Sequence, residues 1–130
     1  MHEVDVRIHK EDKKGNVFTL LKGIRFFQVR ASKYLSIRIP KGFESDGASV
    51  PRFFWRFVFP SSDTHALYAA FVHDFVYRKH PLNWTKELAD RVFFELLVED
   101  GIAPWRARLA YIGVCLFGKK AWNAGGQDND

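Results

Sequence analysis

The hydrophobic pattern of this chain changes its period near residue 62, and this change restricts the possible fold more than any other feature. Before it, Val4, Val6 and Ile8 alternate with polar residues, the turn EDKKGN follows, and then comes VFTLLKGIRFFQV. Residues 34–39 alternate again. Alternation with many aromatic and β-branched residues is typical of strands. We therefore expect a small antiparallel sheet in about the first forty residues.

After residue 62 the apolar residues recur with the period of a helix, and three helices are predicted. The first covers about residues 64–79, with Ser62 or Asp63 as its N-cap. The second covers about residues 85–100, and the third runs from 104 to about 118 or one turn further. Strands followed by helices indicate the α+β class. Because a short connection joins the first two helices, we expect them to be an antiparallel pair.

Length and composition indicate one folded domain. A chain of 130 residues, 47% of them hydrophobic, can bury a single core. We expect this domain to span residues 1–122, and the Gly-rich, acidic residues 123–130 to form a flexible tail. The single cysteine, Cys115, excludes an internal disulfide. The chain shows neither a transmembrane segment nor a signal-peptide core, so secretion by the usual route is not expected.

The basic residues do not indicate a nucleic-acid site. The formal net charge is +5, but the Lys and Arg residues are scattered instead of gathered in one tract. This distribution favours a solvated basic surface.

Four apolar residues recur at helical spacing on the third helix: Trp105, Leu109, Ile112 and Leu116. We expect them in the core rather than in a membrane-binding stripe. Four basic residues of the same region leave interfacial binding open as the alternative. These are Arg106, Arg108, Lys119 and Lys120.

A histidine and an aspartate stand at the centre of the apolar stretch LYAAFVHDFVYRKH. At helical spacing, His73 points towards a neighbouring helix, and Tyr77 lies one turn further on the same side. Asp90 projects from the covered side of the second helix, within reach of His73. A carboxylate facing an imidazole fixes its tautomer and leaves the other nitrogen to take a proton. His73 is thus a candidate general base, with Asp90 as its orienter and one ring edge open to solvent.

Polar residues also gather at the end of the predicted sheet, in GFESDGASVPRFFW. Asp46, Gly47 and Ser49 indicate a tight turn whose oxygen atoms can approach the helix pair. Asp46 and Asp74 offer hard oxygen ligands, which suit calcium or magnesium. The chain has no cysteine cluster or HExxH motif that would support a zinc site.

Each candidate residue also has a purely structural explanation. His73, Asp90 and Tyr77 can form a buried polar clasp between two helices. Asp74 can pair with Arg78 one turn later. The residues of the DGAS turn can simply hold that turn.

Three motifs in a fixed order, DGASVPR, HDFVY and ADRVF, precede an aromatic third helix that ends in FGKKAW. Together they resemble a small uncharacterised family of bacteriophages, prophages and bacteria that is known as a domain of unknown function. The resemblance covers roughly residues 40–122. It implies a phage or prophage component located in the host cytoplasm or the virion, and it assigns no chemistry.

The pattern His73-Asp74-x-x-Tyr77, with Asp90-Arg91 on the next helix, is similar to the active-site helices of secreted phospholipase A2. The resemblance implies that His73 activates water, that Asp74 binds calcium, and that Asp90 orients the histidine with support from Tyr77. The phospholipases carry a Gly-rich calcium loop just before the histidine helix, and disulfides brace their helices. Here PRFFWRFVFPSS stands at that place, so DGAS would have to replace the loop from farther away.

Two function classes follow. The first is a hydrolase, calcium-dependent and phospholipase A2-like if the resemblance holds, acting on a lipid or another component of the host envelope. The second is a non-catalytic phage structural, lysis-cassette or host-interaction protein whose His and Asp residues hold the fold. Nucleic-acid binding rests on charge alone.

Overall fold

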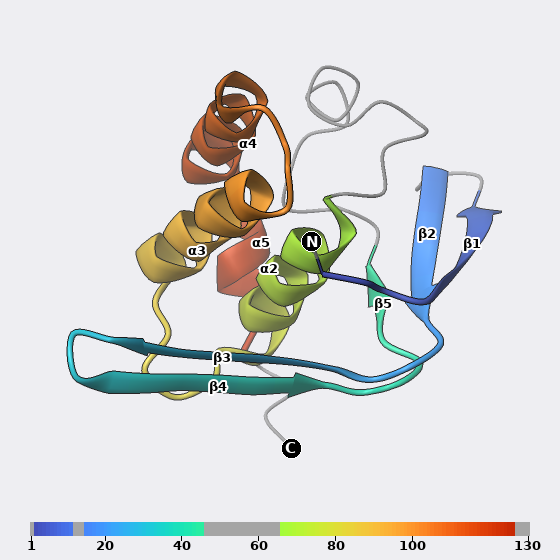
Figure 1. The fold of residues 1–130 in the computed structure, drawn as a ribbon, viewed down its shortest axis with the longest axis horizontal. Coiled ribbons are helices and arrows are strands. Elements are labelled where there is room, and N and C mark those ends of the chain that lie inside the picture. Colours follow the sequence, from blue (N-terminus) through green and yellow to red (C-terminus); the bar gives the residue numbers. More distant parts are fainter. Residues whose placement is uncertain (1, 12–14, 46–65, 127–130) are drawn as a thin grey trace.

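Among the described residues, the strands come first along the chain and the helices follow them (Figure 1). The structure, a computed structural model, describes residues 2–11, 15–45 and 66–126. The predicted α+β class is therefore confirmed. The predicted N-caps of the first helix, Ser62 and Asp63, lie outside the described residues.

The strands form two antiparallel sheets where we expected one. The first contains β1 (Val6–Glu11), β2 (Gly15–Leu20) and β5 (Glu44–Ser45), in the order β1-β2-β5. The second is a hairpin of β3 (Ile24–Arg30) and β4 (Lys33–Ile39). The continuous apolar run that we assigned to one sheet is thus divided between β2 and β3. The chain leaves the first sheet after β2, and the next strand, β3, pairs with β4.

The β3–β4 hairpin buries one face and exposes the other. Its buried side chains belong to the main core: Phe26, Leu35, Ile37 and Ile39. The two turn residues, Ala31 and Ser32, both have positive φ values, of 49° and 65°. Such a two-residue turn matches the twist of the strands that it joins. The hairpin passes beside α2 and α3 and closes one side of the core (Figure 1).

The first two described helices are α2 (Leu67–Lys79) and α3 (Lys86–Glu99), and they pack against each other as predicted. We expected the second helix to begin near Thr85 with that residue as its cap, and the hydroxyl oxygen of Thr85 does accept a hydrogen bond from the amide of Leu88 at 3.2 Å. Tyr77, near the end of α2, meets Asp90 in the first half of α3. The pair brings the predicted polar side chains together.

The predicted third helix is divided into α4 (Pro104–Phe117) and α5 (Lys119–Ala124). The division falls at Gly118, where an added Cβ would lie only 2.6 Å from the Tyr77 hydroxyl. The glycine therefore lets the chain pass close to α2. Beyond it, the ring of Trp122 stacks on that of His80 at 3.7 Å. The helical structure thus continues past residue 122, where we expected the domain to end.

The large apolar residues of α4 correct our prediction. Of the four that we expected in the core, Leu109 is partly buried. The other three are exposed: Trp105, Ile112 and Leu116. The buried face of α4 consists of smaller residues: Ala107, Ala110, Gly113 and Val114. Small side chains let α4 approach α3 closely, and this packing turns the large ones outward. Among the described residues, no helix combines the length and apolarity needed to cross a membrane.

Candidate functional site

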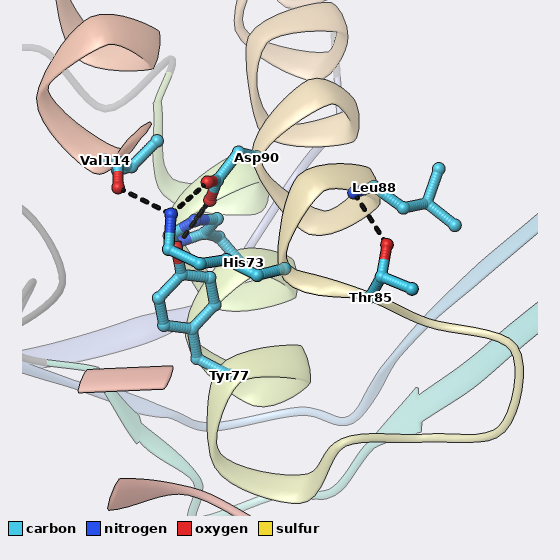
Figure 2. A network of polar contacts seen from close by, with 7 residues as sticks. His73, Tyr77, Thr85, Leu88, Asp90 and Val114 are labelled. Atoms are coloured by element: carbon cyan, nitrogen blue, oxygen red, sulfur yellow. Dashed lines mark hydrogen bonds and ion pairs between the residues drawn. The ribbon is translucent and has the colours of Figure 1, made fainter. Parts of the chain in front are cut away.

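The buried carboxylate of Asp90 is the centre of a polar network that joins three helices (Figure 2). Its Oδ1 accepts hydrogen bonds from Nε2 of His73 at 2.8 Å and from the hydroxyl of Tyr77 at 2.6 Å. Its Oδ2 accepts a hydrogen bond from Lys86 Nζ at 2.7 Å. Lys86 also donates to the backbone carbonyl of Val114 on α4 at 3.0 Å. His73, Tyr77 and Asp90 therefore meet as expected, while their catalytic roles stay predictions.

Helical spacing brings these side chains together. His73 and Tyr77 are four residues apart on α2, and Lys86 and Asp90 are four residues apart on α3, so each pair shares a face of its helix. We did not predict the contribution of Lys86. Its spacing from Asp90 was a signal that could have revealed it. The carbonyl of Val114 gave no such signal because backbone acceptors occur at every residue.

The network holds Asp90 in its ionised form. Burial acts to raise the pKa of Asp90, but the hydrogen bonds and charges of its partners outweigh this effect and leave the pKa below its ordinary value. Burial raises the pKa of Tyr77, and Asp90 raises it further. The phenol therefore keeps its proton and donates a hydrogen bond to Asp90. The Asp90 carboxylate can therefore accept all three hydrogen bonds.

The contact with Asp90 also determines how His73 carries its protons. An ionised carboxylate can only accept hydrogen bonds, so Nε2 of His73 must hold a proton. In the neutral ring, Nδ1 is then the nitrogen with the lone pair. The ammonium of Lys86 lies 2.7 Å from Oδ2 of Asp90 and supplies the opposite charge. A general base whose ring is oriented by an acid has the same hydrogen bond between one ring nitrogen and a carboxylate.

The ring is more deeply buried than a general base should be, because a base must reach the proton that it removes. The side chain of His73 is 1% exposed. Its ring lies 4.2 Å from that of Tyr77 and 4.6 Å from that of Phe93, measured between centroids. Our expectation that one ring edge is open to solvent is therefore wrong. The reason is that α2 and α3 pack closely and place aromatic side chains against the imidazole.

Asp74, the predicted metal ligand, is also buried. Its carboxylate accepts a hydrogen bond from the hydroxyl of Ser45 in β5, which links α2 to the three-stranded sheet. The other residues that we predicted for this region, Asp46, Gly47 and Ser49, lie outside the described residues. Within the described part of the chain, no three His, Cys, Asp or Glu side chains are grouped as a metal site would require. Calcium binding stays a prediction.

A second polar cluster, which we did not predict, lies at the opposite end of the helix pair. Nδ1 of His2 is 2.8 Å from Oδ1 of the buried Asp100, and the His2 ring stacks on Tyr68 at 3.9 Å. Burial, with the nearby acidic charges, raises the pKa of Tyr68 to about 12. Beside this cluster is a cavity of about 330 Å³ bordered by Arg25 and Glu99. These contacts join the N-terminal segment to α2 and α3.

Comparison with known proteins identifies the family. Residues 10–114 match the family model described as "Protein of unknown function (DUF1353)". The chain belongs to the DUF1353 family. The match confirms the resemblance to an uncharacterised family and begins earlier than we expected, at residue 10 instead of about 40. The DUF1353 region contains all of α2 and α3, and therefore the four side chains of the Asp90 network, but it ends before FGKKAW.

The two other comparisons gave no match. No curated protein and no solved structure matches this DUF1353 chain. The similarity to phospholipase A2 stays a prediction.

Proposed function

We propose that this DUF1353 protein is a non-catalytic binding protein in which His73, Asp90 and Tyr77 hold the helices together. The observation that carries the proposal is the burial of the His73 ring, whose side chain is 1% exposed. A general base must reach the proton that it removes, either directly or through one water molecule. A ring covered by Tyr77 and Phe93 is placed to hold structure.

The Asp90 network suits a structural role because both oxygens of the carboxylate have partners. A buried carboxylate is costly unless it is paired and hydrogen-bonded. Lys86 supplies the opposite charge, and its bond to the Val114 carbonyl connects α4 to the α2–α3 pair. Removing one member would leave the others buried with an incomplete set of partners. The network therefore favours one arrangement of the three helices.

A binding role also needs accessible surface, and the outer face of the β3–β4 hairpin offers some. Phe27, Val29 and Tyr34 are exposed there, and the rings of Phe27 and Tyr34 are 6.1 Å apart. Exposed apolar side chains that lie together mark interaction surfaces. We propose a phage or prophage structural, lysis-cassette or host-interaction component. Its location in the host cytoplasm or the virion stays a prediction.

Two substitutions of His73 separate structure from catalysis. Leucine removes the hydrogen bond to Asp90 and is expected to lower the free energy of unfolding by about 2 kcal/mol. Glutamine is the matched control, because its amide can donate to Asp90 from nearly the same place while it cannot act as a base. We expect His73→Gln to keep more of the stability, as measured by urea denaturation. Equal stability of His73→Leu and the wild type would contradict the structural role.

The same proteins test for catalysis. The wild type is expected to hydrolyse neither fluorogenic short-chain esters nor phospholipid vesicles, with or without calcium. Hydrolysis by the wild type that disappears in a folded His73→Gln protein would refute the non-catalytic role.

A hydrolase is the second candidate, and the tautomer of His73 favours it. With Nε2 bound to Asp90, Nδ1 is the basic nitrogen of the neutral ring, and Tyr77 supports the carboxylate. This is the division of roles that the resemblance to phospholipase A2 implies. In this candidate His73 removes a proton from water, which attacks an ester of a lipid or of another envelope component. The side chains that cover the ring would first have to move aside.

The calcium dependence of such a hydrolase has its own test. Calcium takes six to eight oxygen ligands, so Asp74 and the neighbouring Ser45 hydroxyl do not by themselves make a site. If the hydrolase proposal holds, Asp74→Asn should weaken calcium binding measured by calorimetry. Ser45→Ala is the control, because it removes the partner of Asp74 and keeps the carboxylate. Binding unchanged by Asp74→Asn would remove Asp74 from the metal role.

A further inference from the structure

Large apolar side chains form a stripe along the outer face of α4. Trp105 is 60% exposed, Ile112 42% and Leu116 67%, and we call these three side chains the α4 stripe. They recur at helical spacing and therefore share one face. The opposite face of α4 is buried, and α4 lies on the far side of α3 from the β3–β4 hairpin (Figure 1). The α4 stripe is thus an outward-facing surface.

The charged residues of α4 and α5 themselves are all basic. Residues 104–124, which contain α4 and α5, include no Asp or Glu and four basic residues: Arg106, Arg108, Lys119 and Lys120. The guanidinium of Arg106 lies 5.4 Å from the centre of the Trp105 ring. Arg108 is exposed and lies one turn after Trp105. An apolar face flanked by Arg and Lys is what interfacial helices present to anionic lipids.

A second copy of the chain fits this surface less well. In a two-fold dimer, the α4 stripe would meet its own copy, and Arg108 of one chain would approach the basic residues of the other. Like charges placed together across an interface oppose association. An anionic surface is attracted to the same residues, and the net charge of +5 strengthens this attraction at long range.

We propose that α4 binds an anionic lipid surface, with the α4 stripe inserted among the headgroups and Arg108 and Lys119 in contact with lipid phosphates. Trp105 suits this position because tryptophan combines an apolar ring with a polar N–H and is enriched at membrane interfaces. A helix that lies along the surface does not need the length of a membrane-spanning helix. The inference rests on the proposed binding role, adds α4 to the hairpin as a second binding surface, and names the partner of α4.

Binding to vesicles tests this inference directly. The wild type is expected to sediment with vesicles of phosphatidylglycerol and phosphatidylcholine, and to bind vesicles of phosphatidylcholine alone at least about tenfold more weakly. Cys115, the single cysteine, is exposed on α4. A polarity-sensitive dye attached there should shift its emission to the blue when the helix enters the headgroup region. Absence of binding to both kinds of vesicle would overturn the proposal.

Two variants with the same change of charge separate insertion from general attraction. Leu116→Glu lies in the α4 stripe, whereas Leu82→Glu lies in the connection between α2 and α3, where its side chain is also exposed to water. We expect Leu116→Glu to weaken binding by about tenfold and Leu82→Glu by less than about twofold. Equal weakening would show that net charge alone matters and would overturn the role of the stripe. Circular dichroism checks that both variants are folded.

Separate measurements test whether a second copy of the chain covers the α4 stripe and whether the protein is non-catalytic. A dimer in sedimentation equilibrium that Leu116→Glu disrupts, without vesicle binding, would assign the stripe to a second copy and overturn the lipid surface. Hydrolysis that depends on His73 would overturn the non-catalytic role and leave vesicle binding by α4 unaffected.

Discussion

Asp90 links the helices through its buried carboxylate. It accepts hydrogen bonds from His73 and Tyr77 on α2 and from Lys86 on its own helix, and Lys86 extends the contact to α4. A buried carboxylate whose partners are removed is strongly destabilising, whereas the complete network is compatible with a stable core. The ionised state of this one side chain should therefore control stability at acidic pH.

The stability of the wild type should fall as the pH falls below the ordinary pKa of Asp90, 3.8. Because the pKa is lower in the folded protein, the unfolded chain binds more protons in this window, and the free energy of unfolding rises with pH. Asp90→Asn removes the contribution of Asp90 to this dependence and should cost about 3 kcal/mol at neutral pH. Urea denaturation between pH 2 and 7 measures both effects.

Glu95 provides the control for this measurement. The hydrogen bond from Arg30 lowers the pKa of Glu95, but the carboxylate is partly exposed, so solvent screens the interaction. Glu95→Gln should therefore change the acid dependence less than Asp90→Asn does. The same acid slope in the wild type and Asp90→Asn would rule out Asp90 as the source.

At the scale of elements, Gly118 decides how the C-terminal helices meet α2. A Cβ there would lie 2.6 Å from the Tyr77 hydroxyl and 2.5 Å from the Val114 carbonyl. The chain can therefore pass beside Tyr77 only with glycine at this position. Since Tyr77 also donates to Asp90, the break between α4 and α5 is coupled to the buried network.

Gly118→Ala is expected to lower the free energy of unfolding by about 2 kcal/mol, because it forces atoms together in a packed region. Part of this cost should disappear in the Tyr77→Phe background, where the hydroxyl is missing. A double-mutant cycle by urea denaturation measures the coupling. Strictly additive effects would show that Tyr77 does not restrict this position.

The α2–α3 contact was predictable at the same scale, whereas the orientation of α4 was not. The apolar stripes and the short connection indicated that α2 and α3 are neighbours, so His73 could be placed opposite Asp90. On α4, both the large and the small residues recur at helical spacing. Which set becomes buried depends on how closely α3 approaches, and that distance is a property of the packed structure.

At the scale of the whole molecule, the order of strands and helices follows from local patterns, but the division of the strands does not. Alternation marks a segment as a strand without specifying its partner. The sequence therefore indicated an antiparallel sheet, while long-range pairing placed β5 beside β2 and left β3 and β4 as a hairpin. For the same reason, the sequence did not indicate that Ser45 is a partner of Asp74, because the two residues meet only when β5 lies against α2.

Periodicity and short connections act locally, so the residues alone were enough to predict the α+β class, the approximate positions of the helices and the meeting of His73, Asp90 and Tyr77. The covering of the His73 ring and the outward orientation of the α4 stripe follow instead from how the elements pack together. Burial depends on every element that packs around a side chain, and most of those elements are distant in the sequence.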